Sequence, residues 1–581
     1  MTASWLRPAA LVFAVVAALL LAITAPAIAA LRFPDPDDVL RLVQVRDLIA
    51  GQGWFDLTQH RLDAPGGGVA MHWSRLVDLP LAALILVLTP LLGQPLAETV
   101  AAVAVPLLTF GCALLLVARQ TARLCGAETV VYACLALALS VPVLSQVLPL
   151  RIDHHGWQIV LALVALAGVL SSNARRGGWL AGLAMAAWLA ISLEGLPMAA
   201  AICGVLALRW LRDPAGKAGF VNAMLGLAGG SAVLFAATRG VSDLANYCDM
   251  LSPVHLGVLV WGAVGAAALA WLDPRSRPVL LAGLAAIAAG GAAILLAVAP
   301  SCAGGGFAGM DPLVEAFWYR GIAEGQPLWG QSLGGAVQAL IAPLIGLAGL
   351  NALWRGTNDA QERARWLEYA LLLGAALAVT VMVTRAGAVA GAYAAVPFGW
   401  RLQRWLVRLR AAGTPVKAGV MAGVLVLALA IVLPGTRYFP QPASQAPRAE
   451  PQRANECGVR QAAALLDALP KGEILAPMDI GPGLLLGSPH TVIASAHHRG
   501  EKGMRVAIEL FLGAPDKARA ALAERGTAYL ALCPGSNETA RFRSASPAGL
   551  LARLEGGERF DWLEPLPVPA ESNLKVWRIV P

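Results

Sequence analysis

The sequence predicts a polytopic α-helical membrane protein whose spans are followed by a soluble α/β domain. Of the 581 residues, 57% are hydrophobic and only 14% are charged. The mean hydropathy of +0.64 lies outside the range of soluble globular proteins. Apolar runs long enough to cross a hydrocarbon core of about 30 Å recur between residues 8 and 434. These runs are continuous and lack the alternation of barrel strands, so we expect them to be helices.

We place about thirteen such spans along the chain. The first, residues 8–30, resembles a signal peptide in its small residues, but it is long and many spans follow, so we expect it to be retained. The apolar stretch 79–93 is short and contains two prolines, which favours an interfacial or re-entrant segment. The other expected spans are residues 97–118, 128–149, 157–172, 177–193, 198–211, 218–238, 253–272, 278–298, 333–353, 367–384, 386–400 and 417–434.

The loops between the spans give the orientation. With a cytoplasmic N-terminus and a segment 79–93 that does not cross, every cytoplasmic loop carries arginine or lysine, as the positive-inside rule requires. The net charge of +8 then reflects loops that face anionic membrane lipids, and it needs no nucleic-acid partner. We therefore expect a multi-pass protein of the bacterial inner membrane. Its outer face carries residues 31–96, the RIDHHG segment, residues 239–252, residues 299–332 and everything after 435.

Composition divides the chain into three parts. Residues 1–434 form the expected transmembrane domain, with external loops 31–96 and 299–332. Residues 435–455 are a Pro-rich linker, and residues 456–581 form a periplasmic domain of ordinary size. That domain mixes helical patterns such as GAPDKARAALAERG with strand-like runs such as GEILAPM, HTVIASA, TAYLALC and LKVWRIV, which indicates an α/β fold.

Four of the eight cysteines face the outer side in this topology. They are Cys248, Cys302, Cys457 and Cys533. Disulfides are permitted in that compartment. Cys457 with Cys533 is the favoured pair, because both residues lie in the soluble tail.

Aspartates crowd the first outer loop of a chain that is otherwise poor in acids. They are Asp35, Asp37, Asp38, Asp47, Asp56, Asp63 and Asp78. Clustered carboxylates where a span meets water suit a hard cation such as Mg²⁺ or Mn²⁺. The alternative interpretation is that Asp37 or Asp38 caps the helix predicted for VLRLVQVRDLIAG.

The segment RIDHHGWQ, residues 151–158, places an acid and two imidazoles between apolar runs. Polar groups beside a span are costly, so they raise the question of function. Asp153 and His155 are two residues apart and can point to the same ion, and imidazole is a competent ligand for Mn²⁺ although a poor one for Mg²⁺. The alternative is that Asp153 caps the next helix and that His154 and His155 are solvated in the interface.

These two segments resemble a known family. DPDDVLRLVQVRDLIAGQGW followed by APGGGVAMHWSRLVDLP looks like the first external loop of the oligosaccharyltransferase catalytic subunits, a branch of the GT-C membrane glycosyltransferases. The family's first aspartate falls on Asp37, and the arginine of its helix falls on Arg46. Asp153-His154-His155 occupies the position of the family's paired acidic motif. The resemblance implies that Asp37, Asp153 and His155 bind the metal ion, and that His154 contacts the donor phosphate.

Two further matches lie later in the chain. IAEGQP, residues 322–327, resembles a family motif whose glutamate helps to hold the metal and the acceptor, and it implies this catalytic role for Glu324. TRAGAVAGAYAAVP resembles a late-span segment in which an arginine contacts the donor pyrophosphate, and it implies that role for Arg385. The spacing to Tyr393 and Pro397 differs from the family, and a snorkelling interfacial arginine is an equal alternative for Arg385.

The tail departs from the family pattern. Where the family has W-W-D-Y-G, this chain has PMDIG, which keeps Asp479 but loses both tryptophans. A pocket without those donors should not select the hydroxyl of an Asn-linked acceptor peptide. His490, His497, His498 and Arg499 follow. They form an acceptor or phosphate site in one interpretation and are ordinary surface groups in the other.

The resemblance implies a metal-dependent, inverting glycosyltransferase with Mn²⁺ or Mg²⁺. Its donor would be a sugar or glycan on a polyprenyl phosphate or pyrophosphate. Three functions remain open: an oligosaccharyltransferase-like enzyme, a GT-C enzyme that adds one sugar to a lipid, polysaccharide or protein hydroxyl, and a transporter or flippase that only binds lipid-linked sugar. Against the transporter, the acids lie outside the spans, whereas coupling sites lie near the bilayer midplane.

Overall fold

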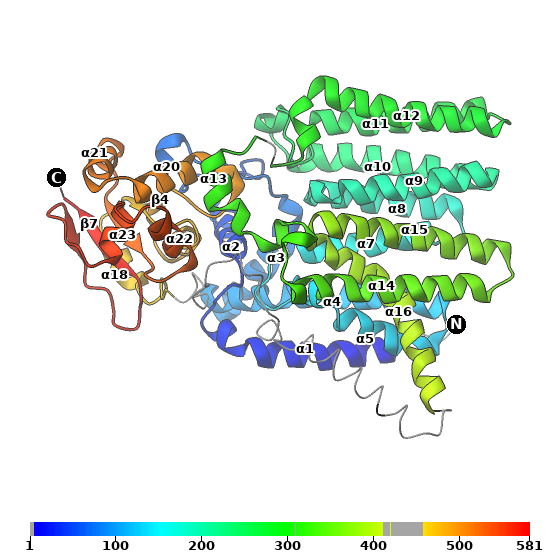
Figure 1. Ribbon diagram of the computed structural model, residues 1–581, viewed down its shortest axis with the longest axis horizontal. Helices are drawn as coiled ribbons and strands as arrows, with labels where there is room; N and C mark the ends of the chain where they lie inside the picture. The colour runs from blue at the N-terminus through cyan, green and yellow to red at the C-terminus, as the bar shows by residue number, and fades with distance from the viewer. Residues whose placement is uncertain (1–4, 308, 411–418, 420–456, 581) are drawn as a thin grey trace.

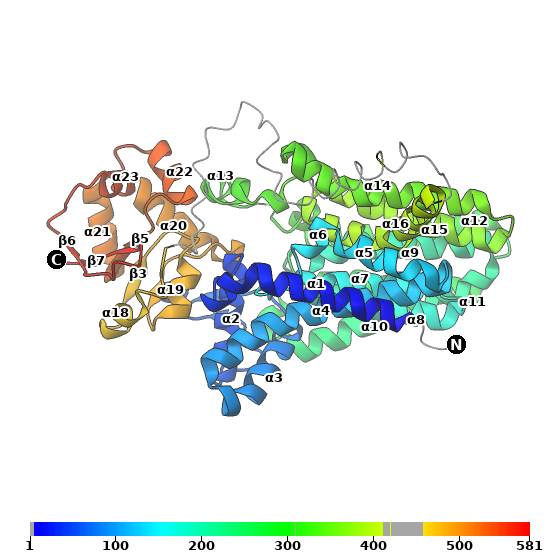
Figure 2. The same cartoon turned by 90° about the horizontal axis from the view of Figure 1, so that it is seen from below.

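The computed structural model describes residues 5–307, 309–410, 419 and 457–580. A long bundle of helices carries a smaller α/β domain at one end (Figures 1 and 2). The helices of the bundle are α1 (Leu6–Ala29), α4 (Gln94–Leu124), α5 (Val130–Ala138), α6 (Val141–Leu144), α7 (His155–Val169), α8 (Ala174–Ile191), α9 (Leu196–Arg212), α10 (Lys217–Thr238), α11 (Pro253–Leu272), α12 (Arg277–Val298), α14 (Leu333–Gly356), α15 (Ala360–Met382) and α16 (Gly387–Arg410).

The predicted membrane class is confirmed, and in the described residues every predicted span except 128–149 falls largely on helix. Within those residues nine helices are long and apolar enough to cross a membrane. The predicted span 128–149 was wrong as a single helix, because α5 ends at Ala138 and α6 is a single short turn. Pro142 lacks the backbone N–H that a continuous helix would need there. The last predicted span, 417–434, lies outside the described residues.

The stretch predicted to be interfacial or re-entrant forms a complete helix, α3 (Arg75–Leu92). Its length and composition meet the criteria for a span, so they do not decide whether it crosses. It lies beside α2 (Pro36–Ile49), at the end of the bundle nearest the α/β domain (Figures 1 and 2). Its interfacial location therefore stays a prediction.

Small residues bring α8 and α10 into backbone contact. A Cβ atom on Gly178 would lie 2.3 Å from the carbonyl oxygen of Gly219, and a Cβ on Gly182 would lie 2.3 Å from that of Ala223. This is the small-xxx-small pattern on both partners, which lets helices in a bilayer pack by close van der Waals contact. The two helices are therefore closely packed up to the loops that follow α8 and α10.

The α/β domain is built on a five-stranded mixed sheet with the order β4-β3-β5-β7-β6. β4, β3 and β5 are parallel, and β7 is antiparallel to β5 and β6. Its elements are α18 (Ala463–Ala468), β3 (Glu473–Leu475), α19 (Gly481–Gly487), β4 (Thr491–Val492), α20 (Glu501–Leu512), α21 (Pro515–Arg525), β5 (Tyr529–Leu532), α22 (Asn537–Ala545), α23 (Leu550–Glu555), β6 (Leu563–Pro565) and β7 (Lys575–Ile579). Each of the four strand-like runs in the sequence contains one of these strands. The predicted linker, residues 435–455, lies outside the described residues.

The first outer loop fastens this domain to the bundle. It contains α2 and a small hairpin, β1 (Thr58–Gln59) and β2 (Val69–Ala70). Leu62 continues the domain sheet through a parallel bridge to Val492. The guanidinium of Arg61 donates to the carbonyl oxygens of Leu485 (2.8 Å) and Ser488 (2.9 Å) at the end of α19. The loop thus holds the domain above the end of the bundle.

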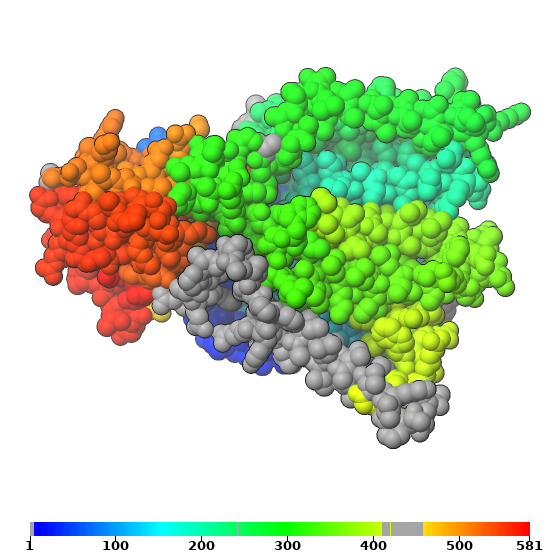
Figure 3. All heavy atoms as spheres, in the orientation of Figure 1, coloured from blue at the N-terminus to red at the C-terminus, as the bar shows by residue number. Residues whose placement is uncertain are grey.

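Residues 299–332 cover another side of the junction, and they include α13 (Pro312–Phe317). Val314 and Trp318 are buried in the same apolar cluster as Phe511 and Phe542 of the domain. Figure 3 shows this segment in green, between the orange surface of the domain and the bundle. The external loops and the domain therefore form one packed layer.

The structure contains the favoured disulfide, Cys457–Cys533, and a second one, Cys248–Cys302. Cys457 and Cys533 are both buried in an apolar core of the domain. The second bridge joins the loop before α11 to the loop after α12.

Removing the domain disulfide should destabilise the domain. We expect Cys533→Ser to lower its free energy of unfolding by about 2–5 kcal/mol, because the bridge closes a long loop with a sequence separation of 76. Thermal unfolding of the purified protein measures this effect. Wild-type protein under reducing agent should show a similar loss, and Cys112→Ser, at an unpaired cysteine, should not. Equal stability of Cys533→Ser and wild type would contradict the expectation.

Candidate active site

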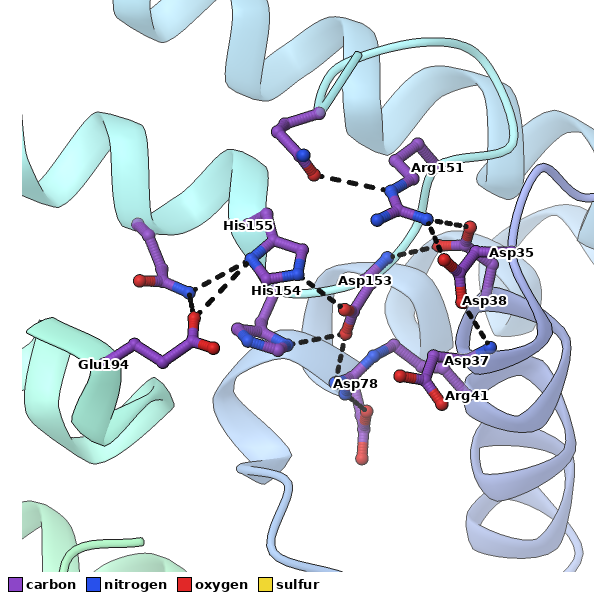
Figure 4. Close-up of polar contacts among 12 residues, drawn as sticks. Asp35, Asp37, Asp38, Arg41, Asp78, Arg151, Asp153, His154, His155 and Glu194 are labelled. Carbon is purple, nitrogen blue, oxygen red and sulfur yellow. Dashed lines mark hydrogen bonds and ion pairs between the residues drawn. The ribbon is translucent and has the colours of Figure 1, made fainter. Parts of the chain in front are cut away.

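Most of the acids and histidines singled out in the sequence gather at the end of the bundle that faces the α/β domain (Figure 1). Figure 4 shows the polar contacts around Asp153, His154 and His155. These residues come from the start of α2, the turn before α7, the turn between α8 and α9, and the loops before α14 and α16. Segments far apart in the chain thus meet in one layer of buried charge.

The start of α2 presents two carboxylates to this layer. Asp35 is the N-cap and accepts a hydrogen bond from the N–H of Asp37 (2.9 Å), and Pro36 takes the first helical position. The alternative that Asp37 or Asp38 caps this helix was therefore wrong. Because Asp35 satisfies the helix end, the other two side chains point into the site.

Asp38 is fully buried and joins α2 to the turn before α7. It accepts from the backbone N–H of Asp153 (2.9 Å) and faces the guanidinium of Arg151 (3.3 Å). Arg151 also pairs with Asp35 (2.9 Å). Sequence reasoning missed Asp38 and Arg151 as members of the site.

Arg41, also missed, lies one turn after Asp37 and is fully buried. Its two terminal nitrogens pair with Asp78 and Asp153, both at 2.9 Å. Its guanidinium lies over the ring of Trp73, 4.4 Å from the centroid. Burial acts to raise the pKa of Asp153, but His154 and Arg41 hold that pKa well below its usual value. Asp153 is therefore an anion at neutral pH.

The two histidines of the DHH motif flank Asp153. The Nδ1 of His154 is 2.6 Å from one carboxylate oxygen, and the Nε2 of His155 is 3.4 Å from the other. Both rings are buried. The alternative that these histidines are solvated at the interface was wrong, and the Asp153 side chain makes no cap hydrogen bond to α7.

Glu324 and Arg385 reach the same cluster from opposite loops. Arg385 pairs with Glu194 at 2.7 Å, and it is 3.7 Å from Glu324. Glu324 is also 3.7 Å from Arg151. Glu194 is 4.0 Å from the Nδ1 of His155, so it links the arginine to the DHH turn. The alternative that Arg385 snorkels at the interface is disfavoured by these contacts.

Asp37 differs from the other acids of the cluster in one oxygen of its carboxyl group. Its Oδ1 atom is buried and has no hydrogen-bond partner among the described residues. Burial raises its pKa well above the ordinary value, and the charges of Asp35 and Asp153 raise it further. A buried, unpaired carboxyl group is the kind of group that takes up a proton or a cation.

The site fits a divalent ion. Asp153, His154 and His155 offer ligand atoms that all lie within 4.8 Å of one another. The 3.4 Å between the His155 nitrogen and the Asp153 oxygen is near the separation of two atoms that share one ion at about 2.1 Å. The unpartnered Oδ1 of Asp37 supplies the orphaned acceptor that a cation would satisfy. A mixed oxygen and nitrogen set suits Mn²⁺ better than Mg²⁺.

A second cluster brings together the tail residues His497, His498 and Arg499. Asp249, from the loop before α11, accepts from Arg499 through both carboxylate oxygens (2.6 Å each) and faces the Nε2 of His498 at 2.7 Å. Arg499 also lies over the ring of Tyr247. The interpretation that these tail residues are ordinary surface groups was wrong for His497, which is 2% exposed.

His72 connects the two clusters. Its ring is 5.1 Å from that of His497, 4.7 Å from that of His498 and 6.5 Å from that of His154. Burial lowers the pKa values of His72 and His497 well below normal, and the charge of His498 lowers both further. Both rings are therefore neutral at pH 7. His490 lies elsewhere, with its ring nitrogens on backbone groups inside the domain.

The PMDIG segment is held by Glu538, a residue that the sequence did not single out. Its carboxylate accepts from the backbone N–H groups of Met478 (2.7 Å) and Asp479 (3.0 Å). Burial raises the pKa of Glu538 to about 8, and the neighbouring Asp479 carboxyl raises it as well. Burial raises the pKa of Asp479 too; Arg541 opposes this shift, and Asp35 adds to it.

Glu538 makes stability depend on pH. The folded protein keeps this proton up to a pKa of about 8, whereas an ordinary glutamate releases it near 4.5. The folded state therefore binds more protons between these values, and the free energy of unfolding should fall as pH rises from 4.5 to 8. We expect Glu538→Gln to reduce this slope in thermal unfolding measured across that range, while the raised pKa values of Asp37, Asp38 and Asp479 keep part of it. A variant with the same slope as wild type would show that another group is responsible.

Comparison with known proteins identifies the fold. No protein-family model and no curated protein matches the chain. Among solved structures, the chain is similar to the archaeal oligosaccharyltransferase AglB from Archaeoglobus fulgidus in complex with an inhibitory peptide and a dolichol-phosphate. The TM-score is 0.67 and the sequence identity is 13%, and the match covers 96% of this chain and 72% of that one. The chain is also similar to the A. fulgidus oligosaccharyltransferase tethered with an acceptor peptide containing the NVT sequon, with a TM-score of 0.62, 16% identity, and coverage of 90% and 68%.

A third similar structure is the same A. fulgidus enzyme in complex with Zn and sulfate, with a TM-score of 0.59, 14% identity, and coverage of 93% of this chain and 70% of that one. At these identities the likeness establishes the fold, and it agrees with the helical bundle, the C-terminal domain and the motif order described above. The chain therefore has the fold of the GT-C membrane glycosyltransferases, in the form seen in the oligosaccharyltransferases.

Proposed function

We propose that this protein is a membrane glycosyltransferase that moves a sugar or glycan from a polyprenyl phosphate or pyrophosphate to an acceptor. The observation that carries the proposal is the buried, unpartnered Oδ1 of Asp37 in the cluster that also contains Asp153 and His155 (Figure 4). Arg385 borders the same cluster through Glu194. Similar structures support a lipid-linked donor, since one of them is a complex with a dolichol-phosphate.

The reaction takes place on the outer face of the bacterial inner membrane in this proposal. The turns at the far end of the bundle carry arginines, including Arg275, Arg277, Arg355 and Arg363, and the positive-inside rule assigns that end to the cytoplasm (Figure 1). The opposite end, with the acids and the α/β domain, then faces the periplasm. Residues 1–434 are the catalytic membrane domain, and residues 456–581 are the periplasmic domain.

Asp37, Asp153 and His155 are the proposed metal ligands, with Glu324 nearby. A bound Mn²⁺ or Mg²⁺ would neutralise charge on the departing phosphate. Arg41 and Asp38 fix Asp153 through its carboxylate and its backbone N–H, so the ligands are held in place by buried groups.

The donor phosphate is proposed to lie beside Arg385 and His154. Arg385 offers a guanidinium fork whose Nε has no hydrogen-bond partner in the described part of the chain. Its pairing with Glu194 keeps this group at the end of the bundle, where a lipid phosphate would arrive from the bilayer.

The acceptor is proposed to approach from the domain side. The carboxylate of Asp37 takes the proton of the acceptor nucleophile, and the nucleophile's oxygen or nitrogen attacks the anomeric carbon in line. The bond from that carbon to the donor phosphate oxygen breaks, the polyprenyl phosphate or pyrophosphate leaves with the electron pair, and the configuration at the carbon is inverted. Glu324 borders the same space and would help to position the acceptor.

Asp479 is the proposed acceptor contact of the PMDIG segment. Without tryptophans in that segment, an acceptor other than an Asn-containing sequon is favoured. The same observation favours, as a second candidate, a GT-C enzyme that adds a single sugar to a lipid, polysaccharide or protein hydroxyl.

Binding of a polyprenyl phosphate tests the proposal. We expect the purified protein in lipid nanodiscs to bind one polyprenyl phosphate, detected by native mass spectrometry. Arg385→Gln should weaken this binding by about 10-fold or more, because it removes a charge-assisted contact. Arg320→Gln is the matched control, since Arg320 is exposed and pairs with the exposed Glu315. Wild-type protein that does not bind the lipid phosphate would contradict the proposal.

A further inference from the structure

Two buried hydrogen-bond donors near His72 have no acceptor within the described residues. The first is His497, whose Nδ1 accepts from the backbone N–H of Arg499 (3.3 Å). A neutral ring with this bond carries its proton on Nε2, and that atom is buried and unpartnered. His497 is 2% exposed, so bulk solvent does not provide an acceptor for this donor.

The second donor is Arg239, at the end of α10. One of its terminal nitrogens donates to the carbonyl oxygen of His72 (2.7 Å), and the other is buried with no partner in the described chain. Arg239 is 7% exposed. A buried donor left unsatisfied is costly, and a charged one more so. Both donors border His72, whose own Nδ1 is also buried and unpartnered.

The charges around these groups determine whether the site suits an anion or a cation. The ligand atoms of His72, His497 and His498 lie within 4.8 Å of one another, which by spacing alone also suits a transition metal. However, Arg239 and Arg499 bring two positive charges to the cluster. Arg75 adds a third positive charge that acts on Arg239. Two acids oppose them: Asp249 is already engaged by Arg499 and His498, and Asp243 acts on Arg239 and accepts from the backbone N–H of Gly240. The free Nε2 of His497 bears a proton and cannot coordinate a metal in that form. An anion fits this environment, and a cation does not.

We propose that His72, His497 and Arg239 form an oxyanion subsite that binds an anionic group, phosphate or carboxylate, of the acceptor. This inference rests on the proposed function and names a class of acceptor for it. Neutral imidazole N–H groups together with one guanidinium are donors that recognise such oxygens.

The position of the subsite favours the acceptor over the donor. The rings form a row from His155 to His154 (4.2 Å), to His72 (6.5 Å) and to His497 (5.1 Å). The proposed donor phosphate site borders the first end of this row, through Arg385 and Glu194. The subsite lies at the other end, where His72 of the first outer loop and Arg239 at the end of α10 meet His497 of the α/β domain. The donor phosphate and the anionic group of the acceptor would then lie on opposite sides of the reacting atoms.

Inorganic phosphate is the probe for this subsite. The full-length protein in nanodiscs is first saturated with a polyprenyl phosphate and is then titrated with inorganic phosphate, with binding followed by phosphorus NMR and by thermal unfolding. We expect phosphate to bind to the lipid-loaded protein. His497→Phe and Arg239→Met should each weaken that binding by about 10-fold or more while the polyprenyl phosphate stays bound.

Matched controls are His60→Phe and Arg320→Met, which change exposed side chains of the same types. If His497→Phe does not fold, Arg239→Met alone decides. The inference is overturned if phosphate competes with the lipid phosphate, since the subsite would then belong to the donor. It is also overturned if both variants bind phosphate as wild type does. Wild-type protein that binds no polyprenyl phosphate would instead remove the proposed function.

Discussion

Asp37→Asn should lower the rate of glycosyl transfer by about 100- to 10,000-fold, with little change in stability. The substitution keeps the shape of the side chain but removes the one carboxyl group in the cluster with a buried, unpartnered oxygen. In the proposed mechanism this group is both a metal ligand and the base, and each role contributes on this scale. Because burial and neighbouring acids already oppose its charge, the folded protein should tolerate an uncharged replacement.

The rate can be measured with purified protein in nanodiscs and a lipid-linked donor extracted from membranes of the same cells, by the release of free polyprenyl phosphate. Asp56→Asn is the matched control, since Asp56 lies in the same outer loop but pairs with the exposed His60 outside the cluster. Full activity of Asp37→Asn at a normal melting temperature would exclude Asp37 from the chemistry.

Arg41→Met should destabilise the protein by about 3–5 kcal/mol. Arg41 is 0% exposed, and its guanidinium is shared by Asp78 and Asp153. Removing one partner of a buried ion pair leaves uncompensated charge, which costs far more than the pair itself contributes. Here Arg75 would still face Asp78 at 3.3 Å, so the larger loss is expected at Asp153.

Thermal unfolding in detergent measures this loss, and lipid phosphate binding reports on the site. Arg320→Gln, which breaks an exposed pair, should change stability by no more than about 1 kcal/mol. If Arg41→Met has the same melting temperature as wild type, the ion pairs of Arg41 do not stabilise the site.

The bundle could be predicted from hydropathy, since spans in lipid must be continuous apolar helices. The break between α5 and α6 was missed because Val141 and Val143, on either side of Pro142, keep the run apolar. Hydropathy also cannot place α3, whose composition suits either a span or the interface. The position of α3 relative to the bilayer is what distinguishes a membrane-crossing helix from an interfacial one.

The site was partly predictable for a related reason. Asp37, Asp153 and His155 stand out locally, as acids and imidazoles beside spans. Asp38 was one of the clustered aspartates and Arg151 begins the RIDHHG segment, but neither was assigned to the site, because the role of each depends on the other across a sequence separation of 113. From sequence alone, an arginine beside a span is interpreted as a membrane anchor. Only the structure shows its carboxylate partner.

His72 and Arg239 show the same limit. His72 lies in the MHWS segment of the first outer loop, which was matched to the family without this residue being singled out. Arg239 follows a span and reads as an ordinary interfacial cation. Their placement beside His497 comes from the packing of three outer segments, which no local pattern encodes.

The most direct test of the central claim is a mass-spectrometric comparison of lipid-linked glycans and envelope glycoconjugates in cells that carry either the intact protein or the double variant Asp37→Asn with Asp153→Asn. The account predicts that the variant cells accumulate one polyprenyl-linked donor and lose one glycoconjugate, which together name both substrates. Unchanged pools of both, with the variant protein present at normal levels in the membrane, would contradict transfer from a lipid-linked donor at this site.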